Sequence, residues 1–499
     1  MNSTEHFGTV ILTFAVYLVG MLGIGVYAYL RTKNSSDYFL GGRSLGPWPA
    51  ALSAGASDMS GWLLLGLPGY AYLAGLESLW LAGGLLLGTW LNWRVVARRL
   101  RHYSIVAEDA LTLPNFFARR FEDEGGVLQG IAAVFVLLFF LFYTSSGLVA
   151  GGKLFEAVFG LNYTVALVAG TACVVSYTLF GGFLAVSWTD FVQGLLMAAA
   201  LIIVPLVAID YDGGISSLTH RLKDINPELL NPFTNTDGNT IGAIAAISLA
   251  AWGLGYFGQP HILARFKAVR SDNEVATARR IAVSWSFISM TGAVLVGLAG
   301  LVYTSGQASI VVEDSEKIFM ILVGALFHPV VAGILLAAIL AAIMSTADSQ
   351  LLVSSSAFTE DLYLKWLRPN ATDQECVMMG RIAVVMLSVI ALLLAWQPEN
   401  TVLGLVSYAW AGFGAAFGPT LLLALFWRRM NKWGALAGVV VGGLTVLIWK
   451  QLSGGLFDLY ELVPGFVFAT LAIIAVSLLS GAPSASITTR FDQVEKELA

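Results

Sequence analysis

The chain has 499 residues, of which 57% are hydrophobic and only 12% are charged, and its formal net charge is −5 at pH 7. A water-soluble protein of this length needs a larger charged surface, so the composition indicates a membrane protein. The two cysteines, Cys173 and Cys376, exclude a disulfide framework, and the five histidines lack metal-ligand spacing. The sequence also lacks a P-loop, so we expect neither an ATP-driven pump nor an enzyme.

Thirteen stretches of the sequence are long and apolar enough to cross a membrane, which takes about 20 residues in an α-helix. They lie near residues 8–30, 48–75, 78–93, 127–152, 161–184, 188–210, 241–258, 281–303, 330–352, 378–396, 403–427, 433–450 and 459–480. The segments between them are too short to fold as separate domains. The sequence therefore predicts an all-α polytopic membrane protein, with residues 1–480 as one transmembrane domain. We expect the polar residues 481–499 to be a disordered cytoplasmic tail.

The basic residues are divided unevenly between the two sides of the predicted membrane domain. With the N-terminus outside, all but five of the 27 Lys and Arg residues fall in segments that face the inside. The exceptions are Lys153, Arg221, Lys223, Lys317 and Lys450. Because basic loops stay on the cytoplasmic side, this asymmetry predicts an outside N-terminus and a cytoplasmic C-terminus.

The second predicted span contains the polar stretch Ser53–Trp62, with Asp58 near the middle of the span. A carboxylate at that depth costs about 2.5–3.5 kcal/mol on insertion scales, which favours a functional role. Gly55 and Gly61 permit local unwinding, and unwinding frees backbone carbonyls that only a protein cavity or an ion can satisfy. An alternative is that the small residues let helices pack closely, but that does not account for Asp58.

The ninth predicted span contains Ala342, Ser345 and Thr346, whose oxygens fall near one point of a helix. One interpretation is local, because Ser and Thr hydroxyls often bond back to the carbonyl three or four residues earlier. The other is that the three oxygens are ligands for a hard cation such as Na⁺. Together with the break in span two, the second interpretation predicts an oxygen cage between the two helices.

The seventh predicted span ends in a stretch rich in aromatic residues and glycine. Trp252 and Tyr256 are four residues apart and would share one face of an α-helix. Several glycines and Pro260 weaken the helix there. The letters GLGYFG match a dinucleotide-binding pattern, but no strand precedes them, so we exclude a nucleotide site. An aromatic belt at the membrane interface is the alternative for the two aromatics.

Six stretches of the sequence resemble the sodium/solute symporter family, and most closely its proline-transporting branch. They are FLGGRSLGP (39–47), ALSAGASDMSGWLLLGLPG (51–69), GGFLAVSWTD (181–190), WGLGYFGQPHILARF (252–266), ILAAIMST (339–346) and LVSYAWAGFGAAFGP (405–419). The resemblance extends over nearly the whole chain. The letters ADSQ after ILAAIMST depart from the proline branch and are more like the broader family.

The resemblance implies a transporter core of two five-helix inverted repeats with broken helices, spans two to six (about 48–210) and spans seven to eleven (about 241–427). It implies sodium ligands on two helices, with an acid nearby. These are the carbonyls of Ala56, Met59 and Ala342, the hydroxyls of Ser345 and Thr346, and the acid Asp58. It implies a substrate site formed by Ser60, Gly61, Trp62, Tyr143, Trp252, Tyr256 and Pro260.

A second cation site is a further hypothesis, based on Asp190, Asp348 and Ser349. Asp348 and Ser349 lie about one helical turn beyond Ser345, and Asp190 is near the start of span six. Neither acid has an evident charge partner in the adjoining spans, and two facing carboxylates would favour a cation between them. The alternative is that both acids reach cytosolic water at the ends of their helices.

The function implied by the resemblance is sodium-coupled uptake of L-proline into the cell by alternating access. Sodium would be the coupling ion, the protein would lie in the bacterial inner membrane, and neither a nucleic acid nor a protein partner is indicated. Aromatic faces suit the apolar ring of a zwitterionic imino acid. One alternative is a symporter of another amino acid, a sugar or pantothenate. Another is a membrane sensor or channel, although the short tail offers no output domain.

Overall fold

The computed structural model describes residues 3–29, 43–178, 182–307, 310–397 and 401–498. Arg31 and Lys33, which belong to the predicted inside charge, lie outside these residues. The described residues form helices joined by short connections, with two isolated β-bridges and no strand. The fold is therefore the predicted all-α membrane architecture.

Each predicted span coincides with one or more helices of the structure. The elements in the membrane domain are α1 (Ser3–Tyr29), α3 (Pro47–Asp58), η2 (Trp62–Gly66), α4 (Leu67–Ala74), η3 (Gly75–Ser78), α5 (Leu79–Leu91), η4 (Asn92–Val96), α8 (Val127–Phe159), α9 (Tyr163–Thr178), α10 (Phe183–Tyr211), α12 (Ala243–Ala250), η6 (Ala251–Gly258), α13 (Pro260–Ala268), α14 (Val275–Ser305), α16 (Pro329–Ser356), η9 (Ala357–Leu367), α17 (Asp373–Leu394), α18 (Val402–Phe426), α19 (Lys432–Trp449) and α20 (Leu462–Leu479). Shorter helices lie in the connections: α6 (Ala97–Val106), α7 (Leu113–Arg120), α11 (Ile215–Ile225), η5 (Pro227–Leu230), η7 (Asp272–Glu274), η8 (Ser315–Lys317), α15 (Ile318–Leu326) and η10 (Gly455–Asp458).

Among the described residues, nine helical stretches are long and apolar enough to cross a membrane, and three shorter apolar helices accompany them. One of the nine, Trp62–Val106, serves two predicted spans because the chain turns back inside it. The turn is at Gly75, whose φ of +62° is accessible to glycine without strain. A Cβ at Gly75 would lie 2.4 Å from the carbonyl oxygen of Leu229.

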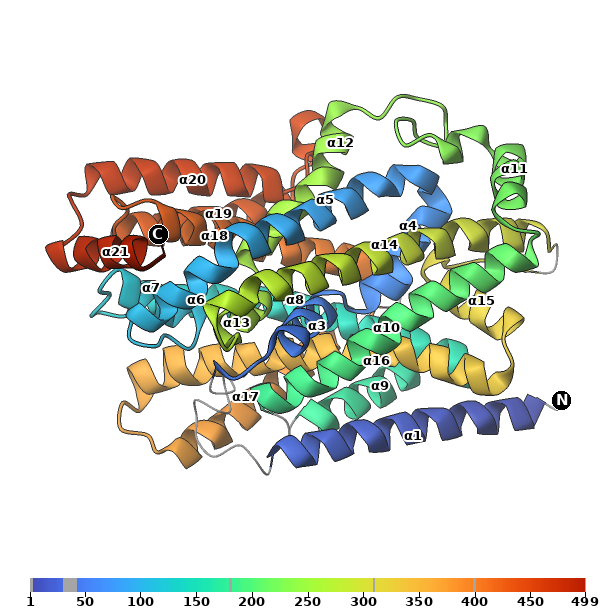
Figure 1. Cartoon of the computed structure of the whole chain (residues 1–499), viewed down its shortest axis with the longest axis horizontal. Coiled ribbons are helices and arrows are strands. Elements are labelled where there is room, and N and C mark those ends of the chain that lie inside the picture. Colours follow the sequence, from blue (N-terminus) through green and yellow to red (C-terminus); the bar gives the residue numbers. More distant parts are fainter. Residues whose placement is uncertain (1–2, 30–42, 179–181, 308–309, 398–400, 499) are drawn as a thin grey trace.

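The helices run roughly parallel along the long axis of the molecule, and the two termini lie at opposite ends of the bundle (Figure 1). Short α3 is in the interior, where it packs against α10, α13, α14 and α16. Helix α18 packs against α8 and η6 on another side of the interior. This arrangement surrounds the interruptions of spans two and seven with other helices.

A close backbone contact joins α5 to η6. A Cβ at Gly84 would lie 2.3 Å from the Ala250 carbonyl oxygen, and one at Gly88 would lie equally close to the Gly253 carbonyl oxygen. In the reverse direction, a Cβ at Gly253 would lie 2.2 Å from the Gly84 carbonyl oxygen. The two elements can approach this closely only because these positions are glycine.

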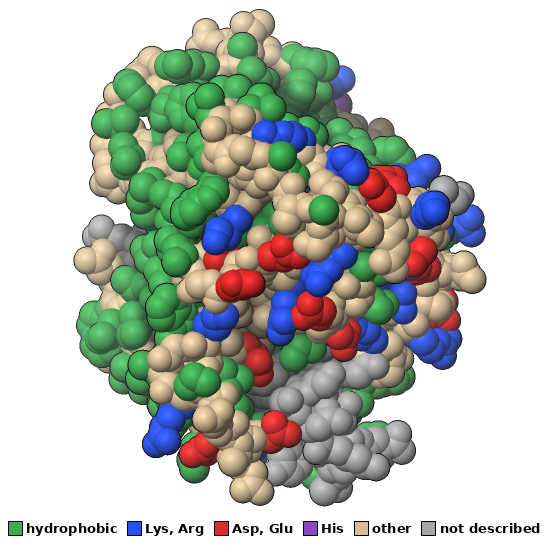
Figure 2. Space-filling view, turned by 90° about the vertical axis from the view of Figure 1, so that its left-hand side faces the viewer, with side chains coloured by type: hydrophobic (Ala, Val, Ile, Leu, Met, Phe, Trp, Pro, Cys, Tyr) green, Lys and Arg blue, Asp and Glu red, His purple; other side chains and the backbone are tan. Residues whose placement is uncertain are grey.

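The C-terminal segment is a helix, so the prediction of a disordered tail is wrong. Helix α21 (Ala485–Leu498) packs on α6 through Ile487, Phe491 and Val494, which are buried. Their spacing of four and three residues places them on one face of the helix. Figure 2 shows the end of the molecule that carries α21, where many Lys, Arg, Asp and Glu side chains gather.

Ion pairs hold α21 to the rest of the chain. Arg428 Nε lies 2.7 Å from Asp492 Oδ1, and Arg490 Nη2 lies 3.2 Å from Glu108 Oε1. The hydrogen bond from Arg428 lowers the pKa of Asp492. Hydrogen bonds from Ser486, at the start of α21, and from Ser484, just before it, lower the pKa of Glu122 in the same way.

Candidate functional site

The break in span two lies at Met59 and Ser60, where α3 ends. In a continuous helix the Ser60 N–H would bond to the Ala56 carbonyl, but here it donates to the Asp58 carbonyl at 3.0 Å. Met59 has φ −85° and ψ 74°, outside the helical region. The Ala56 carbonyl therefore has no backbone donor from the next turn and is available to another helix.

Helix α16 supplies the partners of that carbonyl. Ser345 Oγ lies 2.9 Å from the Ala56 oxygen and 3.1 Å from the Ala342 oxygen, and Thr346 Oγ1 lies 3.3 Å from the Ala56 oxygen. The structure thus brings four of the predicted sodium ligands together, and Met59 is the residue that caps α3. The local interpretation of span nine is confirmed, since Ser345 bonds back to its own helix, and the same hydroxyl also bonds across to α3.

Asp58 is buried beside this group of oxygens. Tyr256 Oη donates to Asp58 Oδ2 at 2.6 Å, while Oδ1 has no hydrogen-bond partner among the described residues. Asp58 and Tyr256 line a small cavity together with Thr89 and Asn92. A carboxylate with one open oxygen gives this part of the site a strong negative potential toward a cation.

Five of the predicted substrate residues surround the end of α3. Trp62 Nε1 donates to the Asp58 carbonyl at 3.1 Å, and Tyr143 Oη donates to the same oxygen at 2.9 Å. Ser60 and Tyr256 contact Asp58 as described above. Gly61 is packed so closely that a Cβ there would lie 2.6 Å from the Ala150 Cβ.

The predicted shared face of Trp252 and Tyr256 does not form, because residues 251–258 are a 3₁₀-helix instead of an α-helix. With three residues per turn, positions four apart point in different directions. Trp252 stacks on Tyr460 with ring centroids 5.5 Å apart, whereas Tyr256 reaches Asp58. Trp410 connects the two, since its Nε1 donates to the Trp252 carbonyl and its ring packs edge-on against Tyr256.

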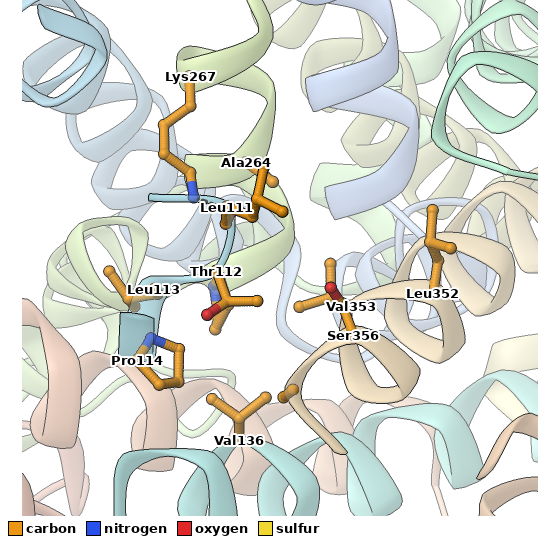
Figure 3. Close-up of a pocket in the computed structure, with 12 residues that line it drawn as sticks. Leu111, Thr112, Leu113, Pro114, Val136, Ala264, Lys267, Leu352, Val353 and Ser356 are labelled. Carbon is orange, nitrogen blue, oxygen red and sulfur yellow. Dashed lines mark hydrogen bonds between the residues drawn. The ribbon is translucent and has the colours of Figure 1, made fainter. Parts of the chain in front are cut away.

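The aromatic side chains of the predicted site do not form a lipid-facing belt. Trp62, Tyr143 and Tyr256 are at most 2% exposed and Trp252 is 7% exposed. Pro260 is also buried and begins α13, but it lines a different cavity, together with Ala264 and Lys267 (Figure 3). The structure therefore gathers five of the predicted substrate residues around Asp58, and it leaves Trp252 and Pro260 outside this group.

The predicted second cation site contains a cation of the protein itself. Arg265 Nη2 lies 3.1 Å from Asp190 Oδ2 and also donates to Ser349 Oγ. Ser53 Oγ donates to the same Asp190 oxygen at 2.7 Å. The expectation that Asp190 lacks a charge partner is wrong. The alternative of water-exposed acids is wrong too, since Asp190 and Asp348 are fully buried.

The residues that sequence reasoning missed are Arg265, Trp410, Tyr460 and Asn92. Arg265 and Trp410 lie within stretches that carry the family resemblance, but their partners are far away in sequence. A charged residue inside an otherwise apolar run, as in PHILARF, was the available signal for Arg265. Nothing in the sequence around Tyr460 or Asn92 separated them from residues that only pack.

Comparisons with known proteins agree with this geometry. The model of the sodium:solute symporter family matches residues 38–442. The chain is 52% identical over 480 residues to the high-affinity proline transporter PutP of Bacillus subtilis, covering 96% of this chain and all of that protein. It is 51% identical over 488 residues to the sodium/proline symporter of Escherichia coli, covering 97% and 96% of the two chains.

Solved structures share the fold at low sequence identity. A sodium-coupled sialic acid symporter, in a substrate-bound outward-open state, superposes with a TM-score of 0.79 at 20% identity, covering 95% of this chain and 99% of that one. The nucleobase-cation symporter Mhp1, in a closed conformation, has a TM-score of 0.53 at 16% identity, with 93% and 100% covered. These relatives are transporters, not enzymes. The family match and the full-length similarity show that this chain belongs to the sodium:solute symporter family.

Proposed function

We propose that this protein couples the entry of Na⁺ to the uptake of L-proline across the bacterial inner membrane. The observation that carries the proposal is the group of oxygens that joins the end of α3 to the middle of α16. An ion bound there would hold the two helices together, so its binding would be coupled to their relative position. Relatives about half identical to this chain over nearly their whole length are named as proline transporters.

The proposed sodium ligands are the Ala56, Met59 and Ala342 carbonyls and the Ser345 and Thr346 hydroxyls. In the sodium-bound state the two hydroxyls would turn their hydrogen atoms away from the carbonyl oxygens and present lone pairs to the ion. Asp58 would add negative charge nearby without occupying the ligand shell. The cage is otherwise neutral, which suits an ion that must also leave.

The proposed substrate site lies next to the same helix end. Trp62, Tyr143, Trp252 and Tyr256 supply apolar faces for the ring, and the backbone at Ser60 and Gly61 supplies polar atoms for the charged groups. Two inverted repeats, about 48–210 and 241–427, would rock around this site during alternating access. We also propose an outside N-terminus and a cytoplasmic C-terminus, a proposal supported by the distribution of basic residues.

We do not propose a second cation site at Asp190, Asp348 and Ser349, because Arg265 already donates to Asp190 and Ser349. A sodium ion could bind there only after the guanidinium moves away. We therefore expect one sodium ion per substrate.

The experiment that tests the proposal is uptake of radiolabelled proline into proteoliposomes. An inward Na⁺ gradient of tenfold adds about 1.4 kcal/mol to the roughly 2.3 kcal/mol that a potential of 100 mV supplies, so one ion could support accumulation of roughly several hundredfold. Replacing external Na⁺ with choline should abolish accumulation. Uptake that persists in choline with a proton gradient would contradict sodium coupling. If another unlabelled solute reduces the uptake of labelled proline but unlabelled proline does not, the substrate assignment would be contradicted.

A further inference from the structure

Helix α5 and the residue that follows it face η6 along one stripe of contacts. The contacts recur every four residues on the α5 side and every three residues on the η6 side. They pair Gly84 with Ala250, Gly88 with Gly253, and Asn92 with Tyr256. Four residues of an α-helix rise about 6 Å, and three residues of a 3₁₀-helix also rise about 6 Å. These three pairs can therefore form together because residues 251–258 are a 3₁₀-helix.

Asn92 ends this stripe with a hydrogen bond, whereas the two glycine positions have only close packing. Its side chain is fully buried, and Nδ2 donates to the Tyr256 carbonyl oxygen at 2.9 Å. In an α-helix that carbonyl would accept from the N–H of residue 260, but Pro260 has no N–H. Carbonyls at the end of a helix need donors from elsewhere, and here a side chain of span three supplies one.

Tyr256 is thus held at both ends, each time by a different span. Its carbonyl accepts from Asn92, and its hydroxyl donates to Asp58 Oδ2 at 2.6 Å. Asn92 and Asp58 also line the same small cavity. Trp410 packs edge-on against the Tyr256 ring, with ring centroids 4.9 Å apart. A shift of the Tyr256 backbone would therefore move its hydroxyl relative to the acid.

We infer that Asn92 is a positioning residue for solute binding, because its bond to the Tyr256 carbonyl keeps η6 in the 3₁₀ form that places the Tyr256 hydroxyl on Asp58. The inference rests on the proposed function, since it takes Tyr256 as part of the solute site and Asp58 as the acid beside the sodium ligands. Asn92 acts through Tyr256 and not by contact with the solute. It fixes η6 relative to span three, and Tyr256 joins η6 to the end of α3.

The test is a double-mutant cycle on sodium-driven proline uptake into proteoliposomes. It compares the parent, Asn92→Ala, Tyr256→Phe and the double variant at saturating Na⁺. Loss of the hydrogen bond to a buried carbonyl should raise the half-saturating proline concentration of Asn92→Ala about five- to tenfold, with a maximal rate within twofold of the parent. Because Asn92 acts through Tyr256, the half-saturating concentration of the double variant should be within twofold of that of Tyr256→Phe. Effects of the two substitutions that multiply, as at independent sites, would overturn the inference.

Asn431→Ala is the matched control for the loss of a buried amide. Asn431 is buried and caps α19, and its Nδ2 donates to the Gly481 carbonyl oxygen at 2.9 Å. This variant should unfold at a lower temperature than the parent but keep the half-saturating proline concentration within twofold. A rise equal to that of Asn92→Ala would show that loss of any buried amide weakens uptake, and it would overturn the positioning role.

Amide hydrogen exchange of the purified protein gives a readout that does not depend on transport. Asn92→Ala should speed the exchange of residues 251–258 and leave α20 as in the parent, because the outside partner of η6 is lost only locally. Asn92→Leu keeps the branched shape without the amide, and it replaces Asn92→Ala if the smaller side chain prevents folding. Exchange of residues 251–258 that stays as in the parent, or that rises equally in α20, would contradict the inference.

The outcomes also separate this inference from the proposed function. A parent that takes up proline with sodium, beside an Asn92→Ala variant with the parent's half-saturating concentration, would overturn the inference alone. A parent that takes up no proline would overturn the proposed function, and this inference with it.

Discussion

Helices α3 and α16 meet at two buried polar clusters that differ in one respect. At the first, Ala56 faces Ser345 and Thr346, and all the converging atoms are neutral oxygens. At the second, about one turn away on both helices, Ser53 and Ser349 surround an ion pair between Asp190 and Arg265. The neutral oxygens of the first cluster could bind an exchangeable cation. The second cluster already contains a cation that is part of the chain, the Arg265 guanidinium.

The difference explains why only one of the clusters suits a coupling ion. An exchangeable site needs ligands that satisfy one another moderately well when the ion is absent, as hydroxyl-to-carbonyl hydrogen bonds do. The free-energy cost of separating a buried ion pair is much larger, because each charge would then be buried without its partner. We therefore interpret the first cluster as the sodium site. We interpret the second as a structural ion pair that holds α3, α10, α13 and α16 together.

The largest effect on stability is expected at the structural ion pair between Asp190 and Arg265. Asp190→Asn leaves the Arg265 guanidinium buried without its counter-charge, which should destabilise the folded protein by about 3–5 kcal/mol. Thermal unfolding of the purified protein in detergent measures the change. The double variant Asp190→Asn/Arg265→Gln should recover part of the loss, because it removes the unpaired charge.

The distinction between the two clusters would be wrong if sodium also binds at the second one. In that case sodium activation of uptake in the parent would have a Hill coefficient clearly above one, and the coefficient would fall to one in Asp348→Asn. We expect a coefficient of about one in both proteins.

The next effect is expected at the oxygen cage. Ser345→Ala and Thr346→Ala each remove one ligand of a charged group, worth about 1.5–3 kcal/mol, so the half-saturating Na⁺ concentration should rise about ten- to hundredfold. Ser355→Ala is the matched control, since the Ser355 hydroxyl is buried in the same helix but, among the described residues, donates to the Leu352 carbonyl of its own helix. Equal sodium activation curves in all three variants would remove the cage from consideration.

A smaller effect is expected at Asp58, which contributes charge but no ligand. Asp58→Asn keeps an oxygen that can accept from Tyr256 and removes the negative charge. We expect the half-saturating Na⁺ concentration to rise about tenfold, equivalent to about 1.4 kcal/mol. Tyr256→Phe, in contrast, should mainly raise the proline concentration needed for uptake. If Asp58→Asn leaves sodium activation unchanged, the acid belongs to the substrate site alone.

The smallest effect is expected at α21, far from both clusters. The pKa values of Asp492 and Glu122 are lower in the folded protein than their usual values of 3.8 and 4.5, so the docking contacts are fully present above those values. They are lost as the pH falls through the lowered pKa values. Amide hydrogen exchange of residues 485–498 should therefore be constant between pH 7 and pH 5, after correction for intrinsic rates, and faster below about pH 4. An Asp492→Asn variant should lose part of this dependence.

The parts of the structure that could be predicted from the sequence are those with a local cause. The break after Asp58 follows from glycines and small polar residues inside an apolar span. The continuous α16 follows from a long, mainly apolar run that has no proline after Pro329 at its start. The apolar face of α21 could also have been predicted, because Ile487, Phe491 and Val494 follow a helical spacing. The polar composition of the tail led to the prediction of disorder instead.

The parts that could not be predicted depend on distant partners or on a small change of helix geometry. Arg265 of α13 and Asp190 of α10 are 75 residues apart in the sequence and meet only in the folded chain. The 3₁₀ conformation of residues 251–258 differs from an α-helix by about 20° per residue, yet that suffices to separate Trp252 from Tyr256. Neither feature leaves a periodic pattern in the sequence.

The contact between the backbones of α5 and η6 limits how this chain can change. Gly84, Gly88 and Gly253 cannot accept even a methyl group without moving a backbone carbonyl. Larger residues would push η6, and with it Tyr256, away from Asp58. Within η6, a change of solute preference by substitution is therefore confined to the side chains on its other sides. Alanine at any of these glycines should lower transport without contacting the solute or the ion.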